Sequence, residues 1–346
     1  MPPAVFYPLT VAAVEPLTDD AAAITFDVPD ALAGQFAFKP GQSLTVRRGD
    51  DRRSYSICVP PGRVPRIGVR EVPGGAVSGW LVRGVRPGDV VDVQPPSGSF
   101  TPDPAVTGHH VLVAAGSGIT PVLSIAWSLL LGGARVTLIY GNRRADTVMF
   151  ADEVADLKDA FPTRMRLLHV LSREAQEVDL FSGRLDEAKL RALLPATVDP
   201  PTVDGWWLCG PYGMVEDAIA VLTESGVPRS RVHRELFYVE DAPPPPAEHA
   251  EQAGPGAEVT VVLDGRATVV AVPPGTPILD GAQRARADLP FACKGGVCGT
   301  CRARVTDGKV TMRRNFALEE PELAAGYVLT CQSLPDTPAV TVDYDS

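Results

Sequence analysis

Short β-like runs of apolar and polar residues, separated by turns rich in glycine and proline, make up the first third of the chain. Turn signals at this spacing are typical of an antiparallel barrel. We therefore predict a β-barrel domain over residues 1–107. Its strands include AAITFDV at 22–28, SLTVRR at 43–48, RIGVREV at 66–72 and DVVDVQ at 89–94.

From His110 the pattern changes to apolar strands that alternate with helix-like stretches. Alternation of this kind predicts a parallel sheet with helices on both faces, and we assign it to residues 108–239. The predicted strands are HVLVAA (110–115), RVTLIYG (135–141), RLLHVLS (166–172) and GWWLCGP (205–211), and the clearest helices are PVLSIAWSLLL (121–131) and ADEVADLKDAF (151–161).

Residues 240–257 lack apolar periodicity and contain four consecutive prolines, Pro243 to Pro246, which favour a semi-rigid extended linker. A third domain is predicted beyond it, at 258–346. It opens with two β-rich runs joined by Asp264-Gly265, a strong hairpin signal. Thr276 is then expected to cap a helix that starts at Pro277.

The uncharged segment from Val111 to Gly133 is long enough to be mistaken for a membrane span. Gly116, Gly118 and Pro121 interrupt it, so we interpret it as strand, turn and helix. The first twenty residues lack the basic start of a secretory signal. The expected compartment is the cytoplasm, with no membrane partner.

The composition, with 45% hydrophobic and 21% charged residues, is ordinary for a globular protein, and 346 residues suggest two or three domains. A net charge of −10 argues against broad nucleic-acid binding, which requires clustered basic residues.

Three of the six cysteines fall within the nine residues CKGGVCGTC. Cys293, Cys298, Cys301 and Cys331 have the plant-type spacing of a 2Fe-2S cluster. By this resemblance we expect residues 258–346 to form a β-grasp, ferredoxin-like domain. The intervening Gly295, Gly296 and Gly299 let the loop bend tightly and bring bare backbone N–H groups to the sulfurs. A structural zinc site in a non-enzymatic scaffold protein is the alternative, although zinc ribbons usually show two C-x2-C pairs.

Basic residues are concentrated around these cysteines in an otherwise acidic protein. They form either a solvated face or a docking surface for an acidic redox partner. The residues are Lys294, Arg302, Arg304, Lys309, Arg313 and Arg314.

The run RSYSI at 53–57 resembles the flavin motif of the ferredoxin-NADP reductase superfamily. The resemblance implies that Arg53 binds the flavin phosphates, that Ser54 belongs to the same motif, that Tyr55 packs along the ring, and that the Ser56 hydroxyl lies near the reactive ring nitrogen. These roles suit a guanidinium fork, a flat phenol and a hydroxyl.

A second flavin segment follows at the distance usual for this superfamily. Gly75 to Ser78 should open a helix, with Val77 inside it, whose free N–H groups face a pyrophosphate; this favours FAD over FMN. Val69 and Arg70 match the positions whose backbone meets the flavin ring.

Three further segments resemble the nucleotide half of the superfamily. AAGSGITP at 114–121 is its version of the glycine-rich turn, with Gly116, Gly118, Ile119, Thr120 and Pro121 at the pyrophosphate and Thr120 capping the helix. LCGPYGM at 208–214 implies Cys209, Gly210, Pro211 and Met214 beside the nicotinamide. HRELF at 233–237 makes Glu235 a candidate to orient groups or move protons around the flavin. By this resemblance Ser56, Cys209 and Glu235 are the expected catalytic residues.

The coenzyme is expected to be NADPH. An NAD site usually places an acid at the end of the second strand, whereas NADP needs basic groups for its extra phosphate. Here the second and third strand ends carry basic or hydroxyl side chains instead: Arg143, Arg144, Ser172 and Arg173.

Together these segments predict a reductase that passes electrons from NADPH through FAD and the 2Fe-2S cluster to another protein. YGNRRADTVMFADEVADLKDAFP, LHVLSRE and VHRELF resemble the reductase subunits of phenylacetyl-CoA epoxidase complexes, which implies a diiron oxygenase as the partner. Reductases of 3-ketosteroid hydroxylases and of ring-hydroxylating dioxygenases share this domain order and remain alternatives.

Overall fold

The computed structural model describes residues 5–49, 51–103, 107–237, 256–286, 288–318 and 320–346. The chain divides into two compact units. One is Tyr7–Asp241; the other combines Met1–Phe6 with Ala242–Ser346. Most of the predicted proline linker lies outside the described residues.

The first sheet is antiparallel and has the strand order β4-β3-β6-β1-β2-β5. A bridge between Ile57 and Ile67 joins the two edge strands, so the sheet closes on itself, as the predicted barrel requires. The strands are β1 (Tyr7–Thr18), β2 (Ala21–Asp27), β3 (Ser43–Arg48), β4 (Asp51–Ser56), β5 (Arg66–Arg70) and β6 (Val90–Val93).

Strand β1 is the longest of the six and was not among the predicted strands. Many of its side chains are exposed and it contains two prolines, Pro8 and Pro16, so its sequence has a weak β-strand pattern. Pairing with both β2 and β6 stabilises the strand. The barrel core is filled by residues such as Phe26, Leu44 and Ile67.

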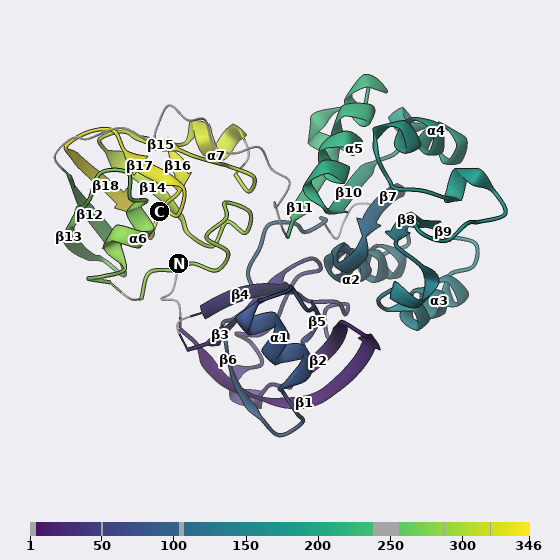
Figure 1. Ribbon diagram of the computed structural model, residues 1–346, viewed down its shortest axis with the longest axis horizontal. Coiled ribbons are helices and arrows are strands. Elements are labelled where there is room, and N and C mark those ends of the chain that lie inside the picture. The colour runs from purple at the N-terminus through teal and green to yellow at the C-terminus, as the bar shows by residue number, and fades with distance from the viewer. Residues whose placement is uncertain (1–4, 50, 104–106, 238–255, 287, 319) are drawn as a thin grey trace. The chain divides into compact units, whose positions relative to one another are not determined.

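The second sheet, in the order β11-β10-β7-β8-β9, is parallel throughout, as predicted. Its helices lie on both faces (Figure 1). The strands are β7 (His109–Ala115), β8 (Arg135–Asn142), β9 (Met165–Leu171), β10 (Gly205–Gly210) and β11 (Val232–Leu236), and the helices are α2 (Ile119–Leu131), α3 (Ala151–Ala160), α4 (Glu187–Thr197) and α5 (Tyr212–Glu224).

Strands β8 and β9 follow β7 on one side of the sheet, whereas β10 and β11 are added on the other side. The strand order therefore reverses between the neighbouring strands β7 and β10. In open α/β sheets, ligands bind beyond the carboxyl ends of the strands at such a switch point. The glycine-rich turn at 116–118 and the segment after Cys209 both begin at this point.

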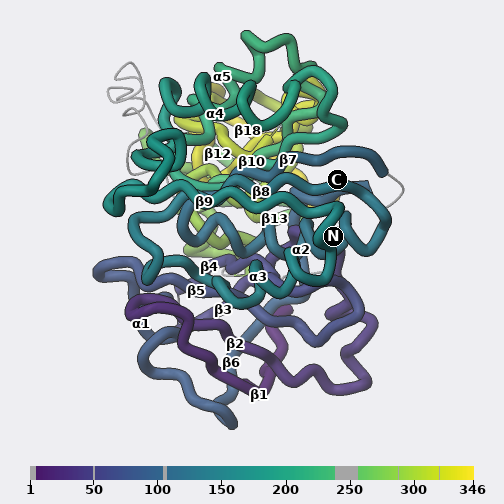
Figure 2. The backbone as a smooth tube through the Cα atoms, turned by 90° about the vertical axis from the view of Figure 1, so that its right-hand side faces the viewer, coloured from purple at the N-terminus to yellow at the C-terminus, as the bar shows by residue number. Residues whose placement is uncertain are grey.

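Barrel and parallel sheet are separate lobes of the Tyr7–Asp241 unit (Figure 1, Figure 2). Arg66 on β5 donates to Glu153 on α3 over 3.0 Å, and its guanidinium lies over the ring of Phe150. A Cβ at Gly68 would lie 2.8 Å from that ring and 2.5 Å from Thr120. The two lobes are therefore closely packed along β5.

The C-terminal unit holds a five-stranded mixed sheet, β13-β12-β18-β14-β16, and a small sheet, β15-β17. Helix α6 (Ile278–Ala282) packs on β12 and β13, which is the predicted β-grasp arrangement. Helix α7 is Glu320–Ala324. The strands are β12 (Ala257–Leu263), β13 (Arg266–Val272), β14 (Arg302–Asp307), β15 (Val310–Met312), β16 (Tyr327–Leu329), β17 (Ser333–Pro335) and β18 (Ala339–Asp343).

The predicted Asp264-Gly265 hairpin is present, and both residues have positive φ, at 56° and 68°. This is the conformation of the two-residue turn that matches strand twist. The Asp345 carboxylate accepts from both backbone N–H groups over 2.8 Å, tying the turn to the chain's last residues.

Both predicted threonine caps are wrong. The turn at Gly116–Gly118 winds as a 3-10 helix that runs into α2, so Thr120 already lies within the helix and donates to the Ser117 carbonyl. Pro277 is extended, at ψ 145°, and α6 begins only after it, without a side-chain cap from the described residues.

The uncharged segment is resolved as predicted into strand β7, a turn and helix α2. Across the described part of the chain, no helix is both long and apolar enough to cross a membrane.

Candidate functional site

The flavin motif lies on β4, which pairs with β3. Ser54 shares a 3.0 Å hydrogen bond with Thr45 on β3. Burial raises the pKa of Tyr55 despite the opposing charge of Arg53. The exposed Arg53 donates to the carbonyl of Arg52 over 2.7 Å. The strand thus presents a cation, a flat phenol and a hydroxyl in succession.

Ser56 ends β4 and is buried, with 3% of its surface exposed. Its hydroxyl donates to Oε2 of Glu235 on β11 over 3.2 Å. Cys209 on β10 is the register partner of Glu235 and is fully buried. The structure therefore brings together the three residues predicted to act in catalysis, from three strands and two lobes.

The electrostatics of these three residues follow from their burial. Enough protein surrounds the carboxyl group of Glu235 that burial raises its pKa to about 8, although the hydrogen bond from Ser56 opposes the shift. Burial also raises the pKa of the Cys209 thiol, and the charge of Glu235 adds to this effect once that carboxyl is ionised. At neutral pH the site therefore holds an uncharged thiol and a largely protonated carboxyl.

The second flavin segment forms helix α1 (Ala76–Arg83), which starts directly after Gly75 as expected. Ser78 does not cap it from the end. Its hydroxyl accepts from the backbone N–H of Val72 and donates to the carbonyl of Gly75, so it holds the preceding turn closed. No side chain in the described ranges caps α1, and its first N–H groups stay available to an anion.

The other residues predicted to contact the flavin differ in burial and in polar contacts. Val77 and Val69 are buried in the barrel core. Arg70 forms a 3.2 Å ion pair with Asp20 and donates to the carbonyl of Thr147. Its backbone ends β5 beside the glycine-rich turn, where a Cβ at Gly116 would lie 2.8 Å from its guanidinium.

The glycine-rich turn is pressed against β10. A Cβ at Gly118 would lie 2.1 Å from the carbonyl oxygen of Cys209, so only glycine fits there. Gly116 has a φ of 54°, in the left-handed region. Ile119, Thr120 and Pro121 form the first turn of α2, where Pro121 costs no hydrogen bond.

The segment after Cys209 turns sharply into α5. Gly210 ends β10, and a Cβ there would lie 2.7 Å from the Met214 methyl group. Pro211 is extended and precedes the first residue of α5. Met214 is buried.

The predicted phosphate-binding residues lie side by side. The backbone N–H of Ser172 donates to the carbonyl of Asn142, and that of Arg173 donates to Arg143, which joins the ends of β8 and β9. Arg144 forms an ion pair with Asp146. The Glu174 carboxylate accepts from the backbone N–H of Ala145.

Asp146 and Glu174 were not singled out from the sequence. Each lies within three residues of an arginine that was predicted to bind phosphate, and this proximity is the feature of the sequence that could have identified them. They add negative charge beside the guanidinium groups, and a bound phosphate would have to compete with Asp146 for Arg144.

The cysteine loop runs from Cys293 to Cys301, with positive φ at Lys294, Gly296 and Gly299. Cys301 and Cys331 are buried, and the other two cysteines are partly exposed. The N–H of Gly295 donates to the Cys293 sulfur over 3.3 Å.

Further backbone N–H groups lie near these sulfurs and favour their ionised form. Those of Val297 and Cys298 act on the pKa of Cys293, that of Thr300 on the pKa of Cys298, and that of Gly296 on the pKa of Cys331. The glycine prediction is thus confirmed for Gly295, whose N–H bonds to a sulfur. A loop that turns N–H groups toward three of the four cysteine sulfurs fits an iron-sulfur core.

Among the described residues, no three histidine, cysteine, aspartate or glutamate side chains are close enough to hold a single metal ion. A 2Fe-2S cluster shares its four thiolates between two irons, so its ligands need not converge on one point. The spacing of the four cysteines therefore carries the assignment at this point.

Four of the six basic residues near the cluster have partners within their own unit. Lys294 pairs with Asp280 and Arg302 with Glu322. Arg304 and Arg313 donate to backbone carbonyls. Much of this positive charge therefore already interacts with groups of the same unit, and the docking surface stays a prediction.

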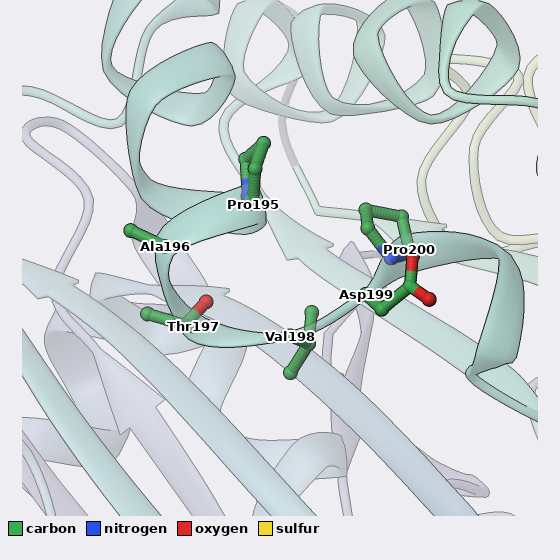
Figure 3. A pocket seen from close by; sticks show the side chains of 6 residues that line it. All are labelled: Pro195, Ala196, Thr197, Val198, Asp199 and Pro200. Atoms are coloured by element: carbon green, nitrogen blue, oxygen red, sulfur yellow. The ribbon is translucent and has the colours of Figure 1, made fainter.

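A shallow hollow of about 380 Å³ lies at the end of α4 (Figure 3). Six consecutive residues, 195–200, line it, and none of them is a predicted site residue. The hollow is therefore no part of the site described above.

Two family profiles match the chain. The 2Fe-2S iron-sulfur cluster binding domain matches residues 261–336, which include all four predicted ligands. The oxidoreductase NAD-binding domain matches residues 112–219.

Several relatives are similar over nearly the whole chain. The chain is 42% identical to a subunit of the 1,2-phenylacetyl-CoA epoxidase of Escherichia coli (strain K12), over 99% of this chain and 98% of that protein. It is 34% identical to the ferredoxin reductase component of 3-ketosteroid-9-alpha-monooxygenase from Rhodococcus rhodochrous, over 97% of this chain and 96% of that protein.

The solved structure of phthalate dioxygenase reductase superimposes with a TM-score of 0.61 at 24% identity and covers 98% of both chains. At this identity the likeness concerns the fold. It extends over the barrel, the parallel sheet and the C-terminal unit.

Proposed function

Because the chain belongs to the family of oxygenase reductases that includes this subunit of the Escherichia coli 1,2-phenylacetyl-CoA epoxidase, we propose that it supplies electrons to a diiron oxygenase that epoxidises phenylacetyl-CoA. The 42% identity over almost the full length carries this proposal. The family uses an oxygenase as electron acceptor, and its members differ in the oxygenase that they serve.

The chain is an electron-transferring oxidoreductase that uses FAD, a 2Fe-2S cluster and a nicotinamide coenzyme. We propose that residues 1–107 hold the flavin, 108–239 the coenzyme and 258–346 the cluster, with 240–257 as the connection. FAD supplies the acceptor of two electrons that can be released one at a time.

The chain's own residues have separate proposed roles around the flavin. Ser56 and Glu235 would hold a shared proton next to the bound flavin, and Cys209 would offer the coenzyme an uncharged, buried surface. Arg53 and the open end of α1 would bind the flavin phosphates. Cys293, Cys298, Cys301 and Cys331 would ligate the cluster.

NADPH is the proposed coenzyme. Arg143, Arg144, Ser172 and Arg173 gather at two adjacent strand ends, where the coenzyme's extra phosphate would bind. The pairing of Arg144 with Asp146 opposes this preference without removing it, since both side chains are more than half exposed and free to rearrange.

The decisive experiment combines the protein with phenylacetyl-CoA oxygenase components and follows NADPH oxidation and phenylacetyl-CoA loss together. We expect coupled consumption, with NADH less effective than NADPH. A Cys331→Ser variant should still accept hydride at the flavin but should leave phenylacetyl-CoA intact. If the wild type reduces an artificial acceptor and phenylacetyl-CoA stays unchanged, the proposed acceptor is wrong.

A 3-ketosteroid hydroxylase is the second candidate acceptor, supported by the 34% identity to the Rhodococcus reductase component. Substituting that oxygenase and its steroid in the same assay separates the two candidates. The proposed compartment is the cytoplasm, where thiols stay reduced. All six cysteines, each within the described ranges, are free of disulfide bonds.

A further inference from the structure

Gln332 directly follows the fourth cysteine, and only 8% of its surface is exposed. Its amide nitrogen lies 2.8 Å from the carbonyl oxygen of Lys294, 3.1 Å from that of Cys331 and 3.6 Å from the Cys331 sulfur. A side-chain amide has two N–H donors, so one serves Lys294 and the other is shared between the carbonyl oxygen and the sulfur of Cys331. One nitrogen therefore ties the fourth ligand to the loop that carries the other three.

Lys294, the loop residue whose carbonyl Gln332 binds, has an uncommon backbone conformation. Lys294 has a φ of 52°, a left-handed conformation that is uncommon for a residue with a side chain. Its amine bonds to Asp280 and to Gln283, each over 2.8 Å. Gln332 holds the carbonyl of the same residue, so Lys294 is anchored at both its side chain and its backbone.

Close packing fixes the position of Gln332 against the loop. A Cβ at Gly296 would lie 3.1 Å from Cγ of Gln332. The backbone of Gln332 is held as well, because its carbonyl accepts from Arg313 over 2.8 Å. Little freedom remains for the amide to leave the sulfur.

An electron added to the cluster increases the negative charge on the cysteine sulfurs, and no proton accompanies it. Hydrogen bonds to these sulfurs and low solvent exposure are among the factors that set the reduction potential. An N–H donor in buried surroundings interacts more strongly with such charge than one in water.

We propose that Gln332 is a positioning residue that raises the cluster's reduction potential by donating to the Cys331 sulfur while it holds the Lys294 carbonyl. This role does not depend on which oxygenase receives the electrons.

The test measures the cluster's midpoint potential by anaerobic redox titration, in the full chain with FAD and cluster bound. Gln332→Met has similar length but no donor, and Gln332→Glu keeps the shape but replaces the donor. Both should shift the potential to more negative values, Gln332→Glu further because its carboxylate adds negative charge. The control Gln283→Met loosens the Lys294 amine, leaves the sulfur bond in place and should retain the wild-type potential.

A second measurement needs no substitution. Wild-type protein with ¹⁵N in its glutamine side-chain amides should show a nitrogen coupling to the reduced cluster by pulsed EPR, because Gln332 lies against a ligand sulfur. Absence of this coupling in the wild type overturns the proposal, even if the variants fail to assemble the cluster. An unchanged potential in both Gln332 variants, or an equal shift in Gln283→Met, overturns it as well.

Discussion

Glu235 illustrates how a single residue acquires its properties from its surroundings. In the sequence it is one of several acids near the end of the parallel-sheet lobe. In the structure it accepts a hydrogen bond from Ser56 and has a pKa of about 8. A carboxyl that is protonated at neutral pH can hold a proton where an ordinary surface glutamate cannot.

This shift predicts a pH dependence of flavin reduction by NADPH. Glu235 is protonated below about pH 8 and ionises as the pH rises through that value, so the rate should fall across this window. Glu235→Gln should abolish this pH-dependent fall, and Glu235→Ala should lower the rate by about a hundredfold. Stopped-flow measurements between pH 6 and 10 test this.

Ser56→Ala provides the matched variant. The serine hydrogen bond opposes the upward shift of the Glu235 pKa, so its removal should move the fall in rate to higher pH. A fall that stays in place in Ser56→Ala, or that persists in Glu235→Gln, would assign the titration to another group.

At the scale of elements, the start of α2 is set by its contact with β10. Gly118→Ala would place a Cβ 2.1 Å from the backbone carbonyl of Cys209, and neither backbone can yield alone. We expect a loss of about 3 kcal/mol in the free energy of unfolding and weaker coenzyme binding. Urea unfolding and coenzyme titration measure the two effects.

Gly213→Ala is the control for Gly118→Ala. Gly213 lies in α5, where a Cβ would meet open space. Alanine there should raise the free energy of unfolding by up to about 1 kcal/mol, because it favours the helix. Equal destabilisation by both substitutions would show that the contact with β10 is not the cause.

The packing of barrel strand β5 on helix α3 gives a second prediction at this scale. Arg66→Met removes the ion pairs to Glu153 and Glu15 from a side chain that is only 14% exposed. A charged hydrogen bond in such surroundings contributes about 2 kcal/mol, and Tyr7–Asp241 should unfold at correspondingly lower urea concentration.

Arg83→Met tests whether any lost ion pair has this effect. The side chain of Arg83 is 62% exposed in its pair with Glu71, and exposed pairs contribute little. Its unfolding should match the wild type. A similar loss in both variants would contradict a special role for the β5–α3 contact.

At the scale of the molecule, the chain consists of two compact units with separate cores. Barrel and parallel sheet share buried residues, since Ala21, Ala23 and Cys58 pack in the same core as Leu112 and Ile119. The C-terminal unit has a core of its own, which includes Cys301 and Cys331.

This division predicts that residues 7–241 suffice for the first half of the electron path. Expressed alone with FAD, they should reduce the flavin with NADPH at the full-length rate, and turnover coupled to an oxygenase should be lost. Stopped-flow kinetics and the coupled assay decide this. A slow or unfolded fragment would show that the C-terminal unit contributes to the flavin half.

Most secondary structure and the family were accessible from the sequence because their signals are local. The strands of the parallel sheet, the Asp264-Gly265 turn and the spacing of Cys293, Cys298 and Cys301 each depend on residues close together in the chain. Strand β1 was not among the named strands, because its pairing with β6 joins distant parts of the chain. The Thr120 cap was wrong because the turn before α2 is itself helical.

The chemistry of the site depended on contacts that no local pattern encodes. Ser56 and Glu235 lie 179 positions apart, and Gln332 reaches Lys294 across 38. Their effects come from burial and hydrogen bonding, which exist only after distant strands have packed. The sequence by itself determined which cofactors and which family to expect. The tertiary structure alone decided that Glu235 is protonated at neutral pH and that Gln332 faces a cluster sulfur. Desolvation and N–H···S contacts decide these two properties, and both exist only in the folded chain.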